Sequence, residues 1–318
     1  MKALRTLLFG IIAAIAVNAV AFAQADYPNQ RVTIIVPFGA GSVTDIMARI
    51  VADDLARRWN QNVIVENRPG LAGTVAAAKA PPDGYTLMLT SNGHTVAALV
   101  NKNLPFDPIK DFAGITRVCS SPLMLITPPD LPAKSVKDLL ALAKDKPGKL
   151  NFSSAGLAST TFIAGALFRK AAAINIVHVP YKGAPDAVTA VMRGDAQMYF
   201  VPVNLAKELV EGGKVNALAA ATAQRLAEMP NVPTFTEAGL PFVYDSWFGL
   251  MTQAAVPREI VQKINKDLTD SLKSPETIAK LKAQFVIPVT DTPEAFDEIV
   301  RRESANLAEV FKEAGVGN

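Results

Sequence analysis

Near the start of the chain, a buried strand runs directly into a glycine-containing turn and a helix. The strand is the β-branched run 32–36, and Pro37 with the glycines of Gly39-Ala-Gly41 ends it. Apolar residues at helical spacing follow from Thr44 and Asp45 onward. Such a turn aims backbone N–H groups and the positive helix end at one point, where open α/β sheets bind anions. A strand-to-helix connection without any ligand explains this stretch equally well.

The same order of elements recurs along the chain. Strands are predicted at 62–66, 85–90, 112–118, 123–127, 150–153, 176–179, 196–201 and 215–221, with helices between most of them. This alternation predicts parallel sheets with crossover helices. Proline-dense breaks at 128–132 and 229–233 suggest two α/β lobes joined by two crossings. The expected lobes are residues 24–127 plus 229–318 and residues 128–228, with their strand-end loops facing a cleft.

The first 23 residues have the pattern of a secretory signal peptide. Lys2 and Arg5 form a basic start, residues 7–17 an apolar core, and Ala21-Phe-Ala23 a cleavage signal before Gln24. The uncharged run 6–25 is also long enough for a membrane anchor. Asn18 and the cleavage signal favour removal, so we expect a periplasmic protein.

Charge and cysteine content limit the function classes. The chain has 32 basic and 29 acidic residues, and loss of Lys2 and Arg5 with the leader brings them close to balance. No basic run with interleaved aromatic residues suggests nucleic acid as a partner. The single cysteine, Cys119, excludes an internal disulfide, and its apolar surroundings predict a buried spectator rather than a nucleophile.

Catalytic constellations are sparse. The histidines His94 and His178 have no spacing typical of a metal site, and no Gly-x-Ser-x-Gly elbow occurs. His178 lies in an apolar strand and is expected to be structural, whereas His94, in a strand-end loop, is a weak ligand candidate. A dinucleotide fingerprint at Gly39-Ala-Gly41 is incomplete because Thr44 stands where a third glycine is needed. We therefore expect no metal and no cofactor.

What remains is a set of hydrogen-bond donors at strand-end turns. Each turn offers backbone N–H groups or hydroxyls, and together they suit a carboxylate held between two lobes. Good turn-forming residues would give the same pattern in each loop taken alone. The candidate ligand-binding residues are Phe38, Gly39, Ala40, Gly41, Ser42, Asp45, Ser91, Asn92, Ser154, Gly156, Ser159, Thr160, Tyr181, Gly183 and Ala184.

Several motifs resemble the solute receptors of tripartite tricarboxylate transporters, often called the Bug or TctC type. In the first lobe they are Tyr27-Pro28, Val36-Pro-Phe-Gly-Ala-Gly-Ser-Val-Thr-Asp45, Val65-Glu-Asn-Arg-Pro-Gly70, Pro82-Asp-Gly-Tyr-Thr86 and Leu104-Pro-Phe-Asp-Pro108. Later come Leu131-Pro-Ala-Lys-Ser135, Pro147-Gly-Lys-Leu-Asn151, Val177-His-Val-Pro-Tyr-Lys-Gly183, Pro230-Asn-Val-Pro-Thr234 and Glu237-Ala-Gly239. Together they cover essentially the whole chain after the signal peptide.

The resemblance implies a type II periplasmic binding protein, with two α/β lobes, no catalysis and no cofactor. It implies that a small carboxylate binds between the loops 38–45 and 154–161, with the turn 181–184 lining the same cleft. It further implies membrane permease subunits as partners. We expect a monomer.

Two positions depart from the family pattern. Ser42 stands where the family usually has a second adjacent glycine, which puts the shape of the first loop in doubt. Phe162 stands where the family's second-lobe helix usually carries a histidine. With Phe38 and Trp247 expected near the cleft, Phe162 suggests an aromatic or otherwise less polar ligand. Packing of Phe162 inside its lobe is the alternative.

Asp45 is the most informative single side chain. It is expected to cap its helix, to orient waters at the ligand, or to do both. Two other function classes stay open: an exported α/β enzyme acting on a small carboxylate, and a ligand-binding partner of a signalling receptor.

Overall fold

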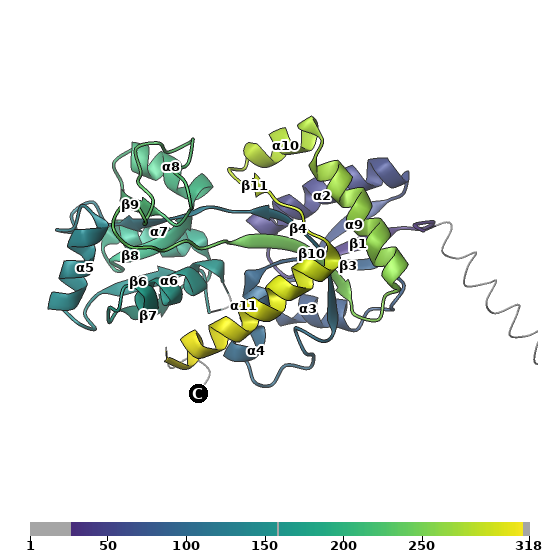
Figure 1. Cartoon of the computed structure of the whole chain (residues 1–318), viewed down its shortest axis with the longest axis horizontal. Coiled ribbons are helices and arrows are strands. Elements are labelled where there is room, and N and C mark those ends of the chain that lie inside the picture. Colours follow the sequence, from purple (N-terminus) through teal and green to yellow (C-terminus); the bar gives the residue numbers. More distant parts are fainter. Residues whose placement is uncertain (1–26, 158, 314–318) are drawn as a thin grey trace, which may run out of the picture.

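The computed structural model describes residues 27–157 and 159–313, which form two α/β lobes side by side (Figure 1). The expected signal peptide, residues 1–23, lies outside the described residues. Within these ranges, no helix has both the length and the hydropathy needed to cross a bilayer.

The first lobe is built on a six-stranded sheet with the order β11-β4-β10-β3-β1-β2. Strand β1 pairs in parallel with both β2 and β3, as the alternation of elements predicted. Strand β10 runs antiparallel to β3 and β4, because the chain enters this sheet from the other lobe. The strands are β1 (Val32–Val36), β2 (Val63–Asn67), β3 (Thr86–Ser91), β4 (Phe112–Ser120), β10 (Trp247–Gln253) and β11 (Ile287–Pro288).

Helices cover both faces of this sheet. They are α2 (Val43–Trp59), α3 (Leu71–Ala78), α4 (Ala97–Val100), α9 (Arg258–Leu272), α10 (Pro275–Lys282) and α11 (Pro293–Glu313). A 3₁₀ turn, η1 (Asn92–Val96), leads into α4, and neither was predicted. Between β1 and α2 the buried core includes Ile34, Met47 and Leu55.

The second lobe has a five-stranded sheet with the order β7-β6-β8-β5-β9. Its strands are β5 (Leu123–Thr127), β6 (Asn151–Ser154), β7 (Val177–Pro180), β8 (Met198–Pro202) and β9 (Asn216–Ala220). Strand β6 is parallel to β7 and β8, whereas β5 is antiparallel to β8 and β9. Its helices are α5 (Val136–Asp145), α6 (Thr160–Ala171), α7 (Ala184–Arg193) and α8 (Val203–Glu211).

Two segments assigned to the first lobe from sequence lie in the second. Strand β5 pairs within the second sheet, although the proline-dense segment after it was taken as the crossing. After β9, the rings of Phe235 and Phe242 pack against Phe168 and Phe200, with centroids 5.4 to 5.9 Å apart. We therefore propose that the crossings lie at residues 121–122 and 245–246. Apolar packing, which proline content does not report, decides where each lobe ends.

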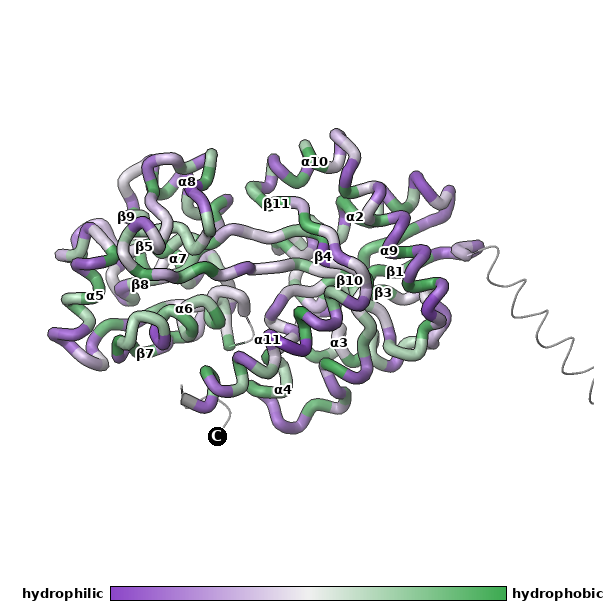
Figure 2. Tube along the Cα trace, in the orientation of Figure 1, coloured by the Kyte–Doolittle hydropathy of each residue, from purple (hydrophilic) through white to green (hydrophobic). Residues whose placement is uncertain are grey.

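The two crossings run side by side between the lobes (Figure 1) and are joined by a hydrogen bond from the Ser121 amide to the Ser246 carbonyl, at 2.8 Å. Helix α11 makes a third connection. It alternates hydrophilic and hydrophobic residues along its length (Figure 2), and its end places Phe311 edge-on to Phe162 of α6. The last helix therefore begins on the first sheet and ends against the second lobe.

Candidate functional site

The turn between β1 and α2 is shaped by its own side chains. Ser42 is the N-cap of α2, and its hydroxyl accepts a hydrogen bond from the Asp45 amide at 3.2 Å. Its backbone is extended (φ −68°, ψ 159°), so a serine is accommodated without strain where the family usually has glycine. Gly41 is the residue that needs glycine, since its φ is +79°. The doubt that Ser42 raised about this loop is thereby removed.

Asp45 holds this turn together. Its carboxylate accepts hydrogen bonds from the Gly41 amide (2.9 Å), the Asn67 side-chain amide (3.0 Å) and the Arg49 guanidinium (3.1 Å). Burial alone would raise the pKa of Asp45, but these three donors outweigh it and hold the pKa below its usual range. Ser42 rather than Asp45 caps the helix, and Asp45 positions the turn that precedes it.

The same turn leaves backbone donors available. In the described chain, no acceptor is found for the amides of Val43 and Thr44, the first two residues of α2. The amide of Ala40, an exposed residue, also lacks an acceptor in the described chain. Unpaired amides at a helix N-terminus attract a carboxylate, because the helix dipole adds to their partial charge.

The second lobe repeats this arrangement between β6 and α6. Ser159 is the N-cap of α6 and accepts from the Phe162 amide at 3.1 Å, while its hydroxyl donates to the Gly156 carbonyl at 2.6 Å. The Thr161 hydroxyl accepts from the Ala155 amide at 3.0 Å. Gly156, at φ +111°, donates to the Ser154 hydroxyl at 3.1 Å. The hydroxyls of this loop thus hold its backbone in place.

The turn after β7 lies next to this loop. The Tyr181 amide donates to the Ser154 carbonyl at 2.9 Å, and a side chain at Gly156 would come within 3.8 Å of the Tyr181 carbonyl. Gly183 is the N-cap of α7, with Ala184 as its first residue. The candidates of the second lobe, Ser154 to Thr160 and Tyr181 to Ala184, are therefore brought together.

His178 is structural, as predicted. Its Nε2 lies 2.7 Å from the buried Ser154 hydroxyl, and burial lowers the pKa of the imidazole to about 4. Its ring also packs on Phe162, which is 1% exposed and lies between Phe152 and Phe311. Trp247 is likewise 1% exposed, packed on Phe296 in the first lobe. Of the two alternatives for Phe162, a position near the cleft or packing inside its lobe, its burial supports the second, and Trp247 is buried as well.

Ser91 and Asn92 were expected to supply ligand donors from a polar strand-end loop, but both are buried. Ser91 ends β3, and Asn92 begins η1 with none of its surface exposed. The Asn92 side-chain amide donates to the Tyr244 hydroxyl (2.5 Å) and the Glu303 carboxylate (3.1 Å). These contacts tie η1 to the second crossing and to α11, so Asn92 is placed to stabilise the junction of the lobes.

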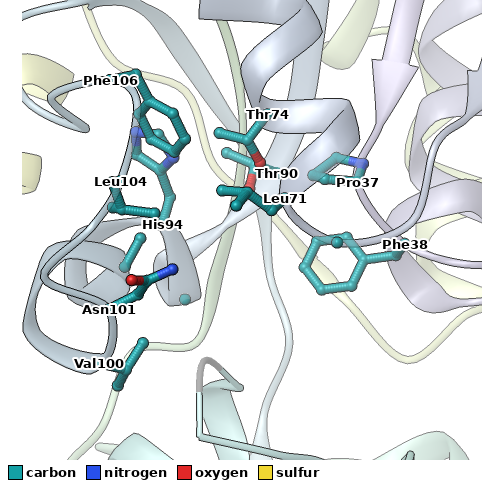
Figure 3. A pocket seen from close by; sticks show the side chains of 13 residues that line it. Pro37, Phe38, Leu71, Thr74, Thr90, His94, Val100, Asn101, Leu104 and Phe106 are labelled. Carbon is teal, nitrogen blue, oxygen red and sulfur yellow. The ribbon is translucent and has the colours of Figure 1, made fainter. Parts of the chain in front are cut away.

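A cavity of about 240 Å³ adjoins the β1–α2 turn (Figure 3). In Figure 3, Phe38 lies on one side of the cavity, Leu104 and Phe106 from the segment after η1 lie on the other, and Leu71 from α3 lines it between them. Of the sequence candidates, Phe38 lines it. The apolar lining consists mainly of Pro37, Phe38, Leu71, Val100, Leu104 and Phe106, and the polar lining of Thr74, Thr90, His94 and Asn101.

Most of these lining residues were missed from sequence. Leu104 and Phe106 were noted as part of a family motif and given no role in a site, and Leu71, which begins α3, was expected in the loop before that helix. No periodicity separates an apolar residue that lines a cavity from one that fills a core. His94 was the one signal, as a histidine in a strand-end loop.

Comparison with known proteins identifies the family. The sequence pattern described as "Tripartite tricarboxylate transporter family receptor" matches residues 47–316. The chain belongs to this receptor family. The Bordetella pertussis protein BugT is 32% identical to the receptor over 96% of each chain. A protein of Agrobacterium vitis from the TAR-I ttuE-ttuC' intergenic region is 34% identical over 93% of the receptor and 88% of its own length.

Solved structures agree with this assignment. Rpa4515 of R. palustris, solved with adipate, superposes on 92% of the receptor and 99% of its own chain, with a TM-score of 0.80 and 31% identity. MatC of Rhodopseudomonas palustris, with bound malate, superposes on 89% of the receptor and 99% of its own chain, with a TM-score of 0.77 and 28% identity. The structure of the periplasmic binding protein BugD superposes with a TM-score of 0.78 and 29% identity. It covers 92% of the receptor and 99% of its own chain. The predicted fold, a two-lobed α/β periplasmic binding protein, is confirmed.

Proposed function

We propose that the receptor works in the periplasm, captures a small carboxylate between its two lobes and delivers it to a tripartite tricarboxylate-type membrane transporter. It acts as a monomer, without a cofactor and without turning the ligand over. The turns 38–45 and 154–161, with 181–184 beside the latter, form the two halves of the site.

One observation carries the proposal. Each lobe presents a serine-capped helix N-terminus directly after a strand, at α2 and at α6. Two such donors on separate lobes suit a carboxylate ligand, and the similar proteins Rpa4515 and MatC are described with adipate and malate. A ligand that contacts both lobes stabilises the closed form by the difference between its affinities for the closed and open states.

Calorimetry and small-angle scattering on the receptor without its signal peptide test this proposal. We expect a carboxylate to bind at a 1:1 ratio and to reduce the radius of gyration of the receptor. The carboxylate should be recovered chemically unchanged after the experiment. Matched amides or alcohols should not bind, since they lack the anion. The absence of binding by every carboxylate tried, or chemical conversion of the bound one, would overturn the proposal.

The transport step needs a separate measurement. We expect deletion of the gene to abolish uptake of the carboxylate that the purified receptor binds. Normal uptake with a lost transcriptional response to that compound would instead favour a partner of a signalling receptor.

A further inference from the structure

The cavity beside the β1–α2 turn contains information about the ligand that the donor turns do not give. Its volume of about 240 Å³ exceeds the roughly 150 Å³ of an apolar protein cavity that holds benzene, so a substituted ring fits. The cavity adjoins the β1–α2 turn at Phe38, because Phe38 lines the cavity and directly precedes Gly39 of that turn. When the carboxylate of a ligand contacts this turn, the rest of the ligand can therefore occupy the cavity.

No side chain of Asp, Glu, Lys or Arg lines this cavity among the residues that the structure describes. Among the described residues that line it, His94 is the one titratable group. It is 5% exposed, its Nε2 lies 2.7 Å from the Pro108 carbonyl, and burial lowers its pKa to about 4. The imidazole is therefore neutral at pH 7, and Nε2 carries the proton that it donates to Pro108.

This charge pattern discriminates between ligands. A second carboxylate placed in the cavity would lose its hydration without gaining a cation, and burying an unpaired charge is strongly unfavourable. An apolar group placed there gains from burial against Phe38, Leu104 and Phe106. The cavity thus favours ligands that have a single carboxylate.

Besides His94, the polar side chains that line the cavity among the described residues are those of Thr74, Thr90 and Asn101. Thr90 is 2% exposed and lines the cavity, and in the described chain its hydroxyl has no hydrogen-bond partner; the same holds for the half-buried Thr74. In Figure 3 both side chains appear between Phe38 on one side and Leu104 and Phe106 on the other. A hydroxyl on the wall of the cavity suits one neutral polar substituent on the ligand.

We propose that the receptor's ligand is a monocarboxylic acid with an apolar, ring-sized body, which occupies this cavity while its carboxylate faces the amides of the β1–α2 turn. A neutral hydroxyl or ring nitrogen on that body pairs with Thr90. This inference rests on the proposed function and names its ligand class. It sets the receptor apart from Rpa4515 and MatC, since adipate and malate each carry two carboxylates.

The test measures calorimetric affinities of the receptor for four probes, the monocarboxylates benzoate and phenylacetate and the dicarboxylates adipate and malate. We expect the better monocarboxylate to bind at least tenfold more tightly than either dicarboxylate. Tighter binding of a dicarboxylate would overturn the inference and leave the proposed function intact. Binding of none of these probes nor of any other carboxylate would overturn both.

A charge-insertion variant locates the effect in the cavity. Leu104→Arg places a cation in a half-buried wall position, so we expect phenylacetate to lose at least tenfold in affinity and adipate to gain. The matched control, Ile64→Arg, adds the same charge on the outer strand β2, where Ile64 is 39% exposed. It should keep the wild-type preference.

An unchanged preference in a folded Leu104→Arg protein would show that the ligand body lies elsewhere. Should that variant fail to fold, Thr90→Val gives a second measurement. It removes the hydroxyl at nearly constant volume, so 4-hydroxyphenylacetate should lose affinity while phenylacetate should not. Equal losses for both acids would contradict the placement.

Discussion

Two glycines in the β1–α2 turn give a matched pair of substitutions that measures how strongly the turn's shape depends on one residue. Gly41 has φ +79°, whereas Gly39 does not have a left-handed φ, and a Cβ built at either position meets nothing within 4 Å. Steric crowding is therefore absent at both sites, and the two alanine variants differ in backbone strain alone.

The expected magnitudes follow from the backbone. Replacing glycine by alanine reduces the entropy of the unfolded chain and stabilises a compatible position by about 0.4–1 kcal/mol. At Gly41 the left-handed conformation costs an alanine about 1–2 kcal/mol, which offsets or exceeds this gain. We therefore expect the free energy of unfolding of Gly41→Ala to lie about 1–2 kcal/mol below that of Gly39→Ala.

Urea unfolding of the two ligand-free variants, followed by circular dichroism, measures this difference. If Gly41→Ala relaxes the turn, its amide moves away from Asp45 and the N-terminus of α2 is reoriented. Carboxylate affinity should then fall at least tenfold relative to wild type, which calorimetry detects. Equal unfolding free energies for the two variants would refute the reasoning, since the only difference on which it rests is φ at residue 41.

Three further predictions concern buried or turn-forming groups. Asp45→Ala removes the acceptor of the Gly41 amide, so carboxylate affinity should fall at least tenfold while the free energy of unfolding drops by about 1–3 kcal/mol; unchanged affinity in calorimetry would count against a role in binding. Glu303 accepts a hydrogen bond from Trp247 at 2.7 Å, and burial raises its pKa from 4.5 to about 7. Glu303 therefore binds its proton more tightly in the folded than in the unfolded state, and the free energy of unfolding should decrease by up to about 3 kcal/mol as pH rises from about 4.5 to 7. Urea unfolding at several pH values should show that the free energy of unfolding of Glu303→Gln depends less on pH. The thiol of Cys119 is buried, and burial raises its pKa, so it should react with a thiol reagent in 6 M guanidinium but not in the native protein; fast native labelling would contradict its position in the core.

Local patterns predicted much of the fold, because hydrophobic periodicity and capping residues act within a few positions. The strand 32–36 and the helix that follows Ser42 form where the apolar spacing placed them. The structural role of His178 and the burial of Cys119 followed from the apolar runs around them, and both are confirmed. The predicted donor turns form as well, and their role in binding stays a prediction.

Lobe boundaries could not be obtained in this way. Proline clusters mark where regular structure stops, but β5 and the segment containing Phe235 and Phe242 belong to the second lobe because of strands and rings that are distant in sequence. The same limitation explains Phe162 and Trp247. Each is aromatic and close in sequence to a turn or a crossing, yet each packs away from solvent.

The sequence by itself determined that the chain forms strand-turn-helix units with donor-rich turns, since apolar spacing and capping residues act between positions that are close in sequence. Tertiary structure decided what surrounds those turns. The Asp45 carboxylate accepts a hydrogen bond from Asn67 at the end of the next strand, and Phe38 lines the same cavity as Leu104 and Phe106. Only the folded chain brings these distant residues together, so the donor turns could be anticipated from residue types, whereas the cavity beside them, lined by no Asp, Glu, Lys or Arg side chain among the described residues, required the fold.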